Sequence, residues 1–142
     1  SLEEGIRVSM RGRPHPIRLE TGPYPEFPTD MQSVMMAAAS IADGTSRIQE
    51  NVFENRFCAA KELQKLGAHI IIENKLAVVD GVNALKGTRM AAEDLRGGAA
   101  LAVAALAADG TSFLDGYEHI SRGYEDIRSD LAGAGARISL IG

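Results

Sequence analysis

The sequence predicts an α/β fold of the α+β kind, built from repeated helix-strand-helix-strand-strand units. Helical and strand-like segments alternate along 142 residues, a length typical of one domain. The chain also repeats itself. Ala42-Asp43-Gly44-Thr45-Ser46 recurs as residues 108–112, at an offset of 66, and an alanine-rich run precedes each copy. Two units of about 66 residues therefore share one plan.

The first unit spans 28–93 and opens with a helix predicted over 31–42. Thr29 can cap its N-terminus, and Gln32, three residues later, completes a capping box. The methionines of this helix are expected in the core, and Gly44 follows its end. Its apolar face is predicted to consist of Val34, Met35, Ala38, Ile41 and Ala42.

The other elements of the first unit follow from local signals, namely alternation for strands and a glycine after a helix. They are a strand over 46–50, a helix over 57–66 ended by Gly67, a hairpin of 69–73 and 76–80 that turns at Asn74-Lys75, and a strand over 87–92.

The second unit, 94–142, is predicted to repeat this plan and to be truncated. Residues 1–27 are expected to be the tail of a preceding unit, with two strands within 5–20. Residues 21–28, which contain three prolines, are expected to be extended and non-helical. The elements of the second unit are a helix over 97–108, a turn at 109–111, a strand over 112–117, a helix over 122–133 and a strand over 136–141.

Composition and charge exclude several classes of protein. With 15 basic and 19 acidic residues, the net charge of −4 argues against non-specific nucleic-acid binding. The longest strongly apolar run, 99–108, is half the length that spans a membrane. The single cysteine, Cys58, cannot form an internal disulfide, is expected to be buried, and favours a reducing cytoplasm. The histidines are scattered, so no metal site is predicted.

Two pairs of positions that the repeat makes equivalent carry the candidate chemistry. Asp30 corresponds to Arg96, each at a predicted helix start, and Arg56 corresponds to Arg122. A cation at a helix N-terminus opposes the helix dipole, and such local violations are expected at functional sites. The arginines could bind phosphate or carboxylate, although all four residues could equally be solvated surface groups.

Five segments form a more specific pattern. They are Phe27-Pro28-Thr29-Asp30-Met31-Gln32, Val52-Phe53-Glu54-Asn55-Arg56-Phe57, Leu66-Gly67-Ala68, Asp94-Leu95-Arg96 and His119-Ile120-Ser121-Arg122-Gly123-Tyr124-Glu125. Together they resemble the UDP-N-acetylglucosamine 1-carboxyvinyltransferase family of enolpyruvyl transferases. The resemblance runs in order from about residue 8 to residue 138.

The resemblance implies an inside-out α/β barrel of two domains, with residues 1–142 an incomplete C-terminal domain. It implies transfer of the enolpyruvyl group of phosphoenolpyruvate to the 3′-hydroxyl of UDP-N-acetylglucosamine, with release of phosphate, as the opening step of bacterial peptidoglycan synthesis. It implies no cofactor and no metal. The partner would be the missing N-terminal domain, which carries the family's reactive cysteine. We therefore expect this chain alone to be inactive.

The resemblance also implies roles for individual residues. Asp30 matches the aspartate that takes the proton from the sugar hydroxyl and contacts the UDP-sugar. Val52 matches a backbone contact to the UDP-sugar, with Phe53 beside it. Arg96 and Arg122 match arginines that bind phosphoenolpyruvate in the closed enzyme.

Two alternatives stay open at this point. The sibling enzyme 3-phosphoshikimate 1-carboxyvinyltransferase has the same fold and chemistry, but the quoted segments fit the UDP-sugar enzyme better. A non-catalytic module could also use this fold to bind a partner, in which case substitution of Asp30 and Arg122 would leave its function intact.

Overall fold

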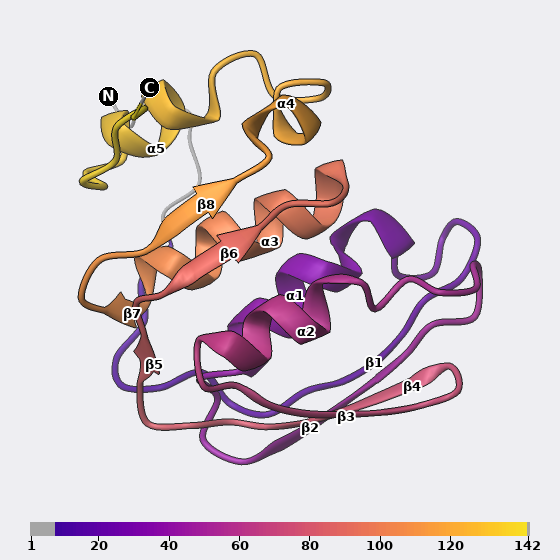
Figure 1. The fold of residues 1–142 in the computed structure, drawn as a ribbon. Coiled ribbons are helices and arrows are strands. Elements are labelled where there is room, and N and C mark those ends of the chain that lie inside the picture. The colour runs from indigo at the N-terminus through magenta and orange to yellow at the C-terminus, as the bar shows by residue number, and fades with distance from the viewer. Residues whose placement is uncertain (1–7, 142) are drawn as a thin grey trace, which may run out of the picture.

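A computed structural model describes residues 8–141 of the chain and shows helices enclosed between layers of strands (Figure 1). A four-stranded sheet has the order β1-β2-β4-β3. Beyond the helices lies the parallel pair of β6 (Arg89–Ala91) and β8 (Phe113–Asp115). The sheet strands are β1 (Arg18–Glu20), β2 (Thr45–Gln49), β3 (His69–Glu73) and β4 (Leu76–Asp80).

Each unit takes part in a parallel pair of strands joined by a helix, and in both pairs the first strand precedes the unit. The helix α1 (Gln32–Ala39) joins β1 to β2, and α3 (Leu95–Leu106) joins β6 to β8. Such a connection places the helix on a face of its strands. The short strands β5 (Leu85–Lys86) and β7 (Ala108–Asp109) form a further parallel pair.

Most predicted elements of the first unit are confirmed. The second strand, β2, forms as expected, and α2 (Ala59–Lys65) is followed by Gly67 at a φ of 94°. The hairpin pairs Glu73 with Leu76. Asn74, in its turn, has a φ of 55°, a left-handed conformation that asparagine tolerates.

The first helix begins later and ends earlier than predicted. A 3-10 turn, η1 (Thr29–Met31), comes first, and the predicted capping box does not form because the Thr29 hydroxyl donates a hydrogen bond to Glu50 instead. The predicted apolar face is confirmed in part: Val34, Met35 and Ile41 pack against the core and Ala42 is fully buried, but the helix is also covered on other sides. Met36 and Ala37 are its most deeply buried apolar residues, whereas Met31 is 45% exposed.

The second half of the second unit departs furthest from the prediction. The helix expected over 122–133 forms only over 127–133, as α5 (Ile127–Gly133), and the short helix α4 (Tyr117–Ile120) was not predicted. Residues 121–126 are non-helical, and Gly123 there packs so closely on α3 that a Cβ would lie 2.5 Å from Leu95 Cδ2. Asp126 then caps α5 by accepting a hydrogen bond from the Ser129 amide.

The two ends of the chain are less regular than expected. Within the described residues, 136–141 form no strand, and no counterpart of β4 is present for them to pair with. Only one of the two strands expected within 5–20 appears, namely β1, and residues 1–7 lie outside the described range. Residues 21–28 are non-helical but not extended, because the Gly22 amide donates to the Phe27 carbonyl and closes a compact loop.

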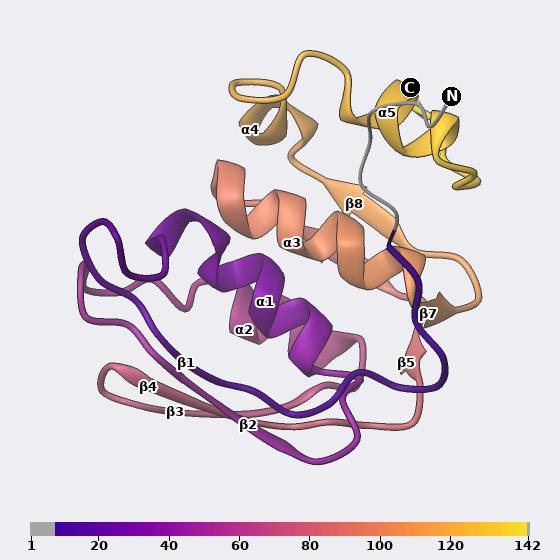
Figure 2. The same cartoon turned by 180° about the vertical axis from the view of Figure 1, so that it is seen from behind.

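The core lies between the layers of strands, where α1 packs on the four-stranded sheet and α3 packs against α1 on the side toward β8 (Figure 2). Both helices contribute mainly alanine to it, including Ala37, Ala39, Ala100 and Ala104. Alanine gives a helix high intrinsic stability and lets two helix backbones approach closely. The alanine-rich runs of the two units therefore form the centre of the domain.

A glycine at the end of β4 tests how tightly α1 is held against the sheet. A Cβ on Gly81 would lie 1.9 Å from the Ala42 backbone oxygen, which cannot move without the turn after α1. We expect Gly81→Ala to destabilise the fold by about 3 kcal/mol, the upper end for overpacking. The control is Gly133→Ala in α5, where a Cβ meets nothing within 4 Å and the effect should be near zero. Thermal unfolding measures both, and equal melting temperatures would contradict the expectation.

Candidate functional site

Asp30 and Arg96, the two positions that the repeat makes equivalent, are in direct contact. Asp30 lies in η1 just before α1, and Arg96 is in the first turn of α3. Because α1 and α3 lie side by side, their starts meet, and Arg96 Nε donates a hydrogen bond to Asp30 Oδ1. Two residues at equivalent positions of the repeat therefore form an ion pair in the structure.

Arg56 joins this pair from the loop between β2 and α2. Its Nη2 lies 3.8 Å from Asp30 Oδ1, and its guanidinium stacks 4.5 Å from the centre of the Phe53 ring. The Arg56 Nε is buried and has no hydrogen-bond partner among residues 8–141. Arg56 thus keeps donor capacity that Asp30 does not use.

An open cavity of about 280 Å³ lies beside this cluster. It is large enough for part of a small ligand. The two arginines in its wall make it suitable for an anion, since guanidinium groups bind phosphate and carboxylate with paired hydrogen bonds. The lining residues are Ser33, Phe53, Glu54, Asn55, Arg56, Cys58, Asp94 and Arg96.

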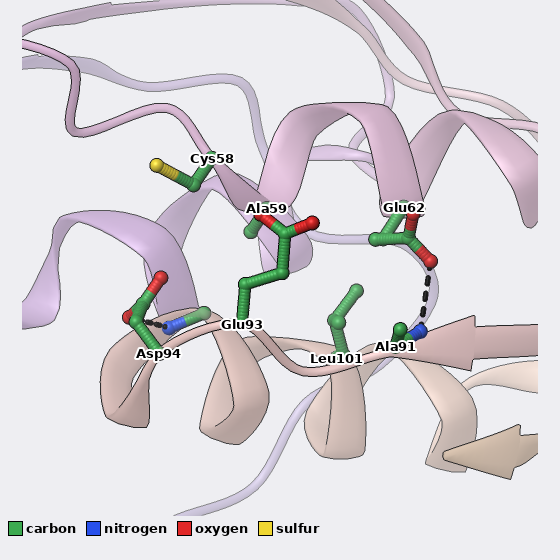
Figure 3. A pocket seen from close by; sticks show the side chains of 8 residues that line it. Cys58, Ala59, Glu62, Ala91, Glu93, Asp94 and Leu101 are labelled. Carbon is green, nitrogen blue, oxygen red and sulfur yellow. Dashed lines mark hydrogen bonds between the residues drawn. The ribbon is translucent and has the colours of Figure 1, made fainter. Parts of the chain in front are cut away.

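A second, nearly closed space lies between the start of α2 and the segment that enters α3 (Figure 3). Its volume of about 10 Å³ holds at most one water molecule. Glu62 accepts a hydrogen bond from the Ala91 amide at 2.8 Å, and Asp94 accepts from the Gly97 amide at 2.8 Å. The first bond ties α2 to the segment that leads into α3, and the second caps α3. Together they position the first turn of α3, which carries Arg96.

Cys58 is exposed, which corrects the prediction that it is buried. It precedes the first residue of α2, and its thiol donates to the Asn55 carbonyl at 3.1 Å, so its side chain stays at the surface beside the larger cavity.

The ion pair sets the charge state of the cluster. The hydrogen bond from Arg96 lowers the pKa of Asp30; slight burial opposes this, and the positive charges of Arg96 and Arg56 add to it. The hydrogen bond to Asp30 in turn raises the pKa of Arg96. At neutral pH the trio of Asp30, Arg56 and Arg96 therefore carries one carboxylate and two guanidinium ions, and the acidic residues Glu54 and Asp94 also line the cavity beside it.

The structure also describes the surroundings of the three remaining predicted site residues, Val52, Phe53 and Arg122. Val52 is 40% exposed, and Phe53, 48% exposed, lines the cavity. Arg122 is exposed after α4, and none of the ion pairs formed by residues 8–141 includes it. The structure therefore brings together Asp30, Arg96, Arg56 and Phe53, and leaves Arg122 outside.

Glu50 is a residue of this region that the sequence interpretation missed. It is 1% exposed and accepts hydrogen bonds from the hydroxyls of Thr21 and Thr29, both at 2.8 Å, and from the amides of Val52 and Phe53. Burial acts to raise the pKa of Glu50, but these four hydrogen bonds outweigh it and lower the pKa. Alternation along β2 could have shown it, because Ser46, Ile48 and Glu50 share the inward face.

Residues 2–131 match the family of EPSP synthase (3-phosphoshikimate 1-carboxyvinyltransferase). The chain belongs to this family. Curated relatives named UDP-N-acetylglucosamine 1-carboxyvinyltransferase include one from Anaeromyxobacter sp. (strain Fw109-5), 52% identical over 96% of this chain and 32% of the relative. Another, from Desulfofundulus thermocisternus, is 52% identical over 96% of this chain and 56% of the relative. The chain thus spans about a third of the length of the first of these relatives.

Solved structures of the family confirm the expected fold. The enolpyruvyl transferase NikO from Streptomyces tendae superimposes with a TM-score of 0.78 at 34% identity, covering 88% of this chain and 29% of that protein. EPSP synthase from Acinetobacter baumannii gives a TM-score of 0.52 at 20% identity, covering 66% of this chain and 24% of that protein, which is a likeness of fold alone. The resemblance of the five sequence segments to enolpyruvyl transferases is therefore confirmed.

Residues 8–141 contain no cluster of three or more His, Cys, Asp or Glu side chains able to hold a metal ion. No helix in the same range has both the length and the apolar character to cross a membrane.

The ion pair predicts how Asp30 titrates. Because its folded pKa lies below the unfolded value of about 3.9, the pair stabilises the fold above about pH 4, and this contribution is lost as the pH falls through the folded pKa. We expect Arg96→Gln to raise the pKa of Asp30 toward 3.9, as followed by carboxyl-carbon NMR with labelled aspartate. Arg122→Gln removes the same charge without touching Asp30 and should leave its pKa unchanged. Equal titration curves for the two variants would contradict this assignment.

Proposed function

We propose that this chain is part of an enzyme that transfers the enolpyruvyl group of phosphoenolpyruvate to the 3′-hydroxyl of UDP-N-acetylglucosamine, releasing phosphate. The observation that carries the proposal is the contact of Asp30 with two arginines beside an open cavity, in a chain 52% identical to relatives of that name. The relatives of that name, 42–52% identical over nearly the whole chain, favour the UDP-sugar over shikimate 3-phosphate.

Asp30 serves as the base in this proposal. Its lowered pKa keeps it ionised at neutral pH, but a carboxylate paired with Arg96 is a weak proton acceptor. An anionic substrate that draws the Arg96 guanidinium away would release Asp30 and raise its basicity. Binding of phosphoenolpyruvate would then prepare Asp30 to accept the proton of the sugar hydroxyl.

The arginines bind phosphoenolpyruvate in this proposal. The reaction adds the sugar oxygen to the enolpyruvyl group and then expels phosphate, so negative charge stays on the phosphate and carboxylate throughout. Arg96 and Arg122 are assigned to these groups, and Arg56, which lines the cavity, adds a third cation. Guanidinium groups held in a closed, dry cleft are suited to stabilising this charge.

Val52 and Phe53 are assigned to the UDP-sugar. Both are substantially exposed beside the Asp30 cluster, and Phe53 lines the cavity. The Val52 and Phe53 amides are held by Glu50, so the groups that this exposed loop offers to a sugar and a nucleotide are its other backbone atoms and the aromatic side chain of Phe53.

The remaining two thirds of the relatives' length is proposed to supply the rest of the site. Turnover then requires a second domain, and this chain alone would be inactive. Phosphoenolpyruvate and UDP-N-acetylglucosamine are the proposed small-molecule partners, the proposed pathway is peptidoglycan synthesis, and the proposed location is the bacterial cytoplasm, in keeping with one unpaired cysteine.

Phosphate release by the full-length protein that carries this domain tests the proposal. We expect release with phosphoenolpyruvate plus UDP-N-acetylglucosamine, and a 10²- to 10⁴-fold lower kcat for Asp30→Asn, the range for loss of a general base. The matched control is Asp130→Asn, which changes an exposed carboxylate in α5 and should retain full activity.

Three other outcomes would contradict parts of the proposal. Release only with shikimate 3-phosphate would show the sibling activity. Release with neither acceptor would favour a non-catalytic module. Full activity of Asp30→Asn would remove Asp30 from the role of base.

A further inference from the structure

Glu50 is a buried carboxylate that no step of the proposed reaction uses. It has no cation beside it among residues 8–141; its charge is held by four neutral donors. Burying an ionised carboxylate is costly unless it is well hydrogen-bonded, and an apolar side chain would fill the same space at lower cost. Its position therefore calls for a role beyond packing.

The two oxygens of Glu50 reach two different segments. Oε1 accepts from the Thr21 hydroxyl and from the amides of Val52 and Phe53, at 2.9 and 3.1 Å. Oε2 accepts from the Thr29 hydroxyl at 2.8 Å. Thr29 opens the 3-10 turn whose next residue is Asp30. One carboxylate thus joins the loop proposed to contact the sugar to the turn that carries the proposed base.

Apart from Glu50, the contact that joins these two segments is the long Arg56–Asp30 ion pair, at 3.8 Å with Asp30 largely exposed, so Glu50 supplies their buried link. Each belongs to a connection rather than to a sheet or a long helix: residues 51–58 form an irregular loop, and η1 has a single turn. Misplacement of a reacting group by about 1 Å can lower a rate about 100-fold. A rigid link between base and substrate contacts is therefore of direct use to catalysis.

We propose that Glu50 is a positioning residue that sets Asp30 against the Val52–Phe53 segment, so that the base and the bound sugar hydroxyl meet in register. This proposal rests on the function proposed above. Glu50 touches neither substrate; it acts through Thr29 on one side and through two backbone amides on the other.

Thr29→Val in the full-length enzyme isolates one arm of this link. It removes the hydroxyl and keeps the side-chain shape, so Asp30 loses its connection to Glu50. We expect kcat to fall about tenfold, with the KM for phosphoenolpyruvate unchanged and the melting temperature lowered by a few degrees, because Glu50 Oε2 loses its hydroxyl donor. Thr29→Ser, which keeps the hydroxyl, should restore kcat.

The control uses the same chemistry at the far end of β2. Thr45 donates to Asp80 there at 2.6 Å, so Thr45→Val breaks another threonine-carboxylate bond of the same strand. It should leave kcat unchanged. A similar loss of kcat in both valine variants, or no loss in Thr29→Val, would overturn the positioning role.

Glu50→Gln tests the other arm. It keeps the shape but replaces charge-assisted bonds to the Val52 and Phe53 amides with weaker neutral ones, so the KM for UDP-N-acetylglucosamine should rise about fivefold. An unchanged KM would overturn this part of the proposal. A wild type without turnover on the UDP-sugar would instead overturn the proposed function itself, so the two failures are distinguishable.

Discussion

The side-by-side packing of α1 on α3 is the constraint on which the rest of the structure depends. Their alanines allow a close approach, and their shared role in the repeat brings their starts to the same end of the core. Residues at equivalent positions of the two units therefore become neighbours in space. This is why Asp30 and Arg96, which are 66 residues apart, form an ion pair, and why a site lies where the two units meet.

The two carboxylates of this region, Asp30 and Glu50, obey opposite physical rules. The Asp30 side chain is 60% exposed. An ion pair this open to solvent contributes only about 0–1 kcal/mol to stability, so an incoming anion can replace Asp30 beside Arg96 at a small cost in free energy. Glu50 is almost fully enclosed, and breaking its bonds would leave buried donors unpaired. The first carboxylate is thus suited to exchange partners during a reaction, and the second to stay fixed.

Local sequence signals predicted β2 from alternation, the end of α2 from a glycine and the hairpin turn from an asparagine, because these signals act over a few residues. The features that the sequence did not predict depend on contacts between residues far apart in the chain. The start of α1 was wrong because the Thr29 hydroxyl bonds to Glu50, which lies 21 residues away. The non-helical segment at Gly123 packs on Leu95, which belongs to another helix. The opposite charges of Asp30 and Arg96 were visible in the repeat, but their convergence required the fold.

The same repeat explains why Arg122 stands apart. The repeat makes Arg122 equivalent to Arg56, and Arg96 equivalent to Asp30. In the first unit Arg56 lies beside the carboxylate of Asp30, whereas the same arrangement in the second unit would place two guanidinium groups side by side. Like charges repel at such distances, so Arg122 has no reason to approach Arg96 directly. An anion between them would satisfy both. The change of one carboxylate to a guanidinium between two equivalent units thus leaves Arg96 and Arg122 without a counterpart of the Arg56–Asp30 ion pair.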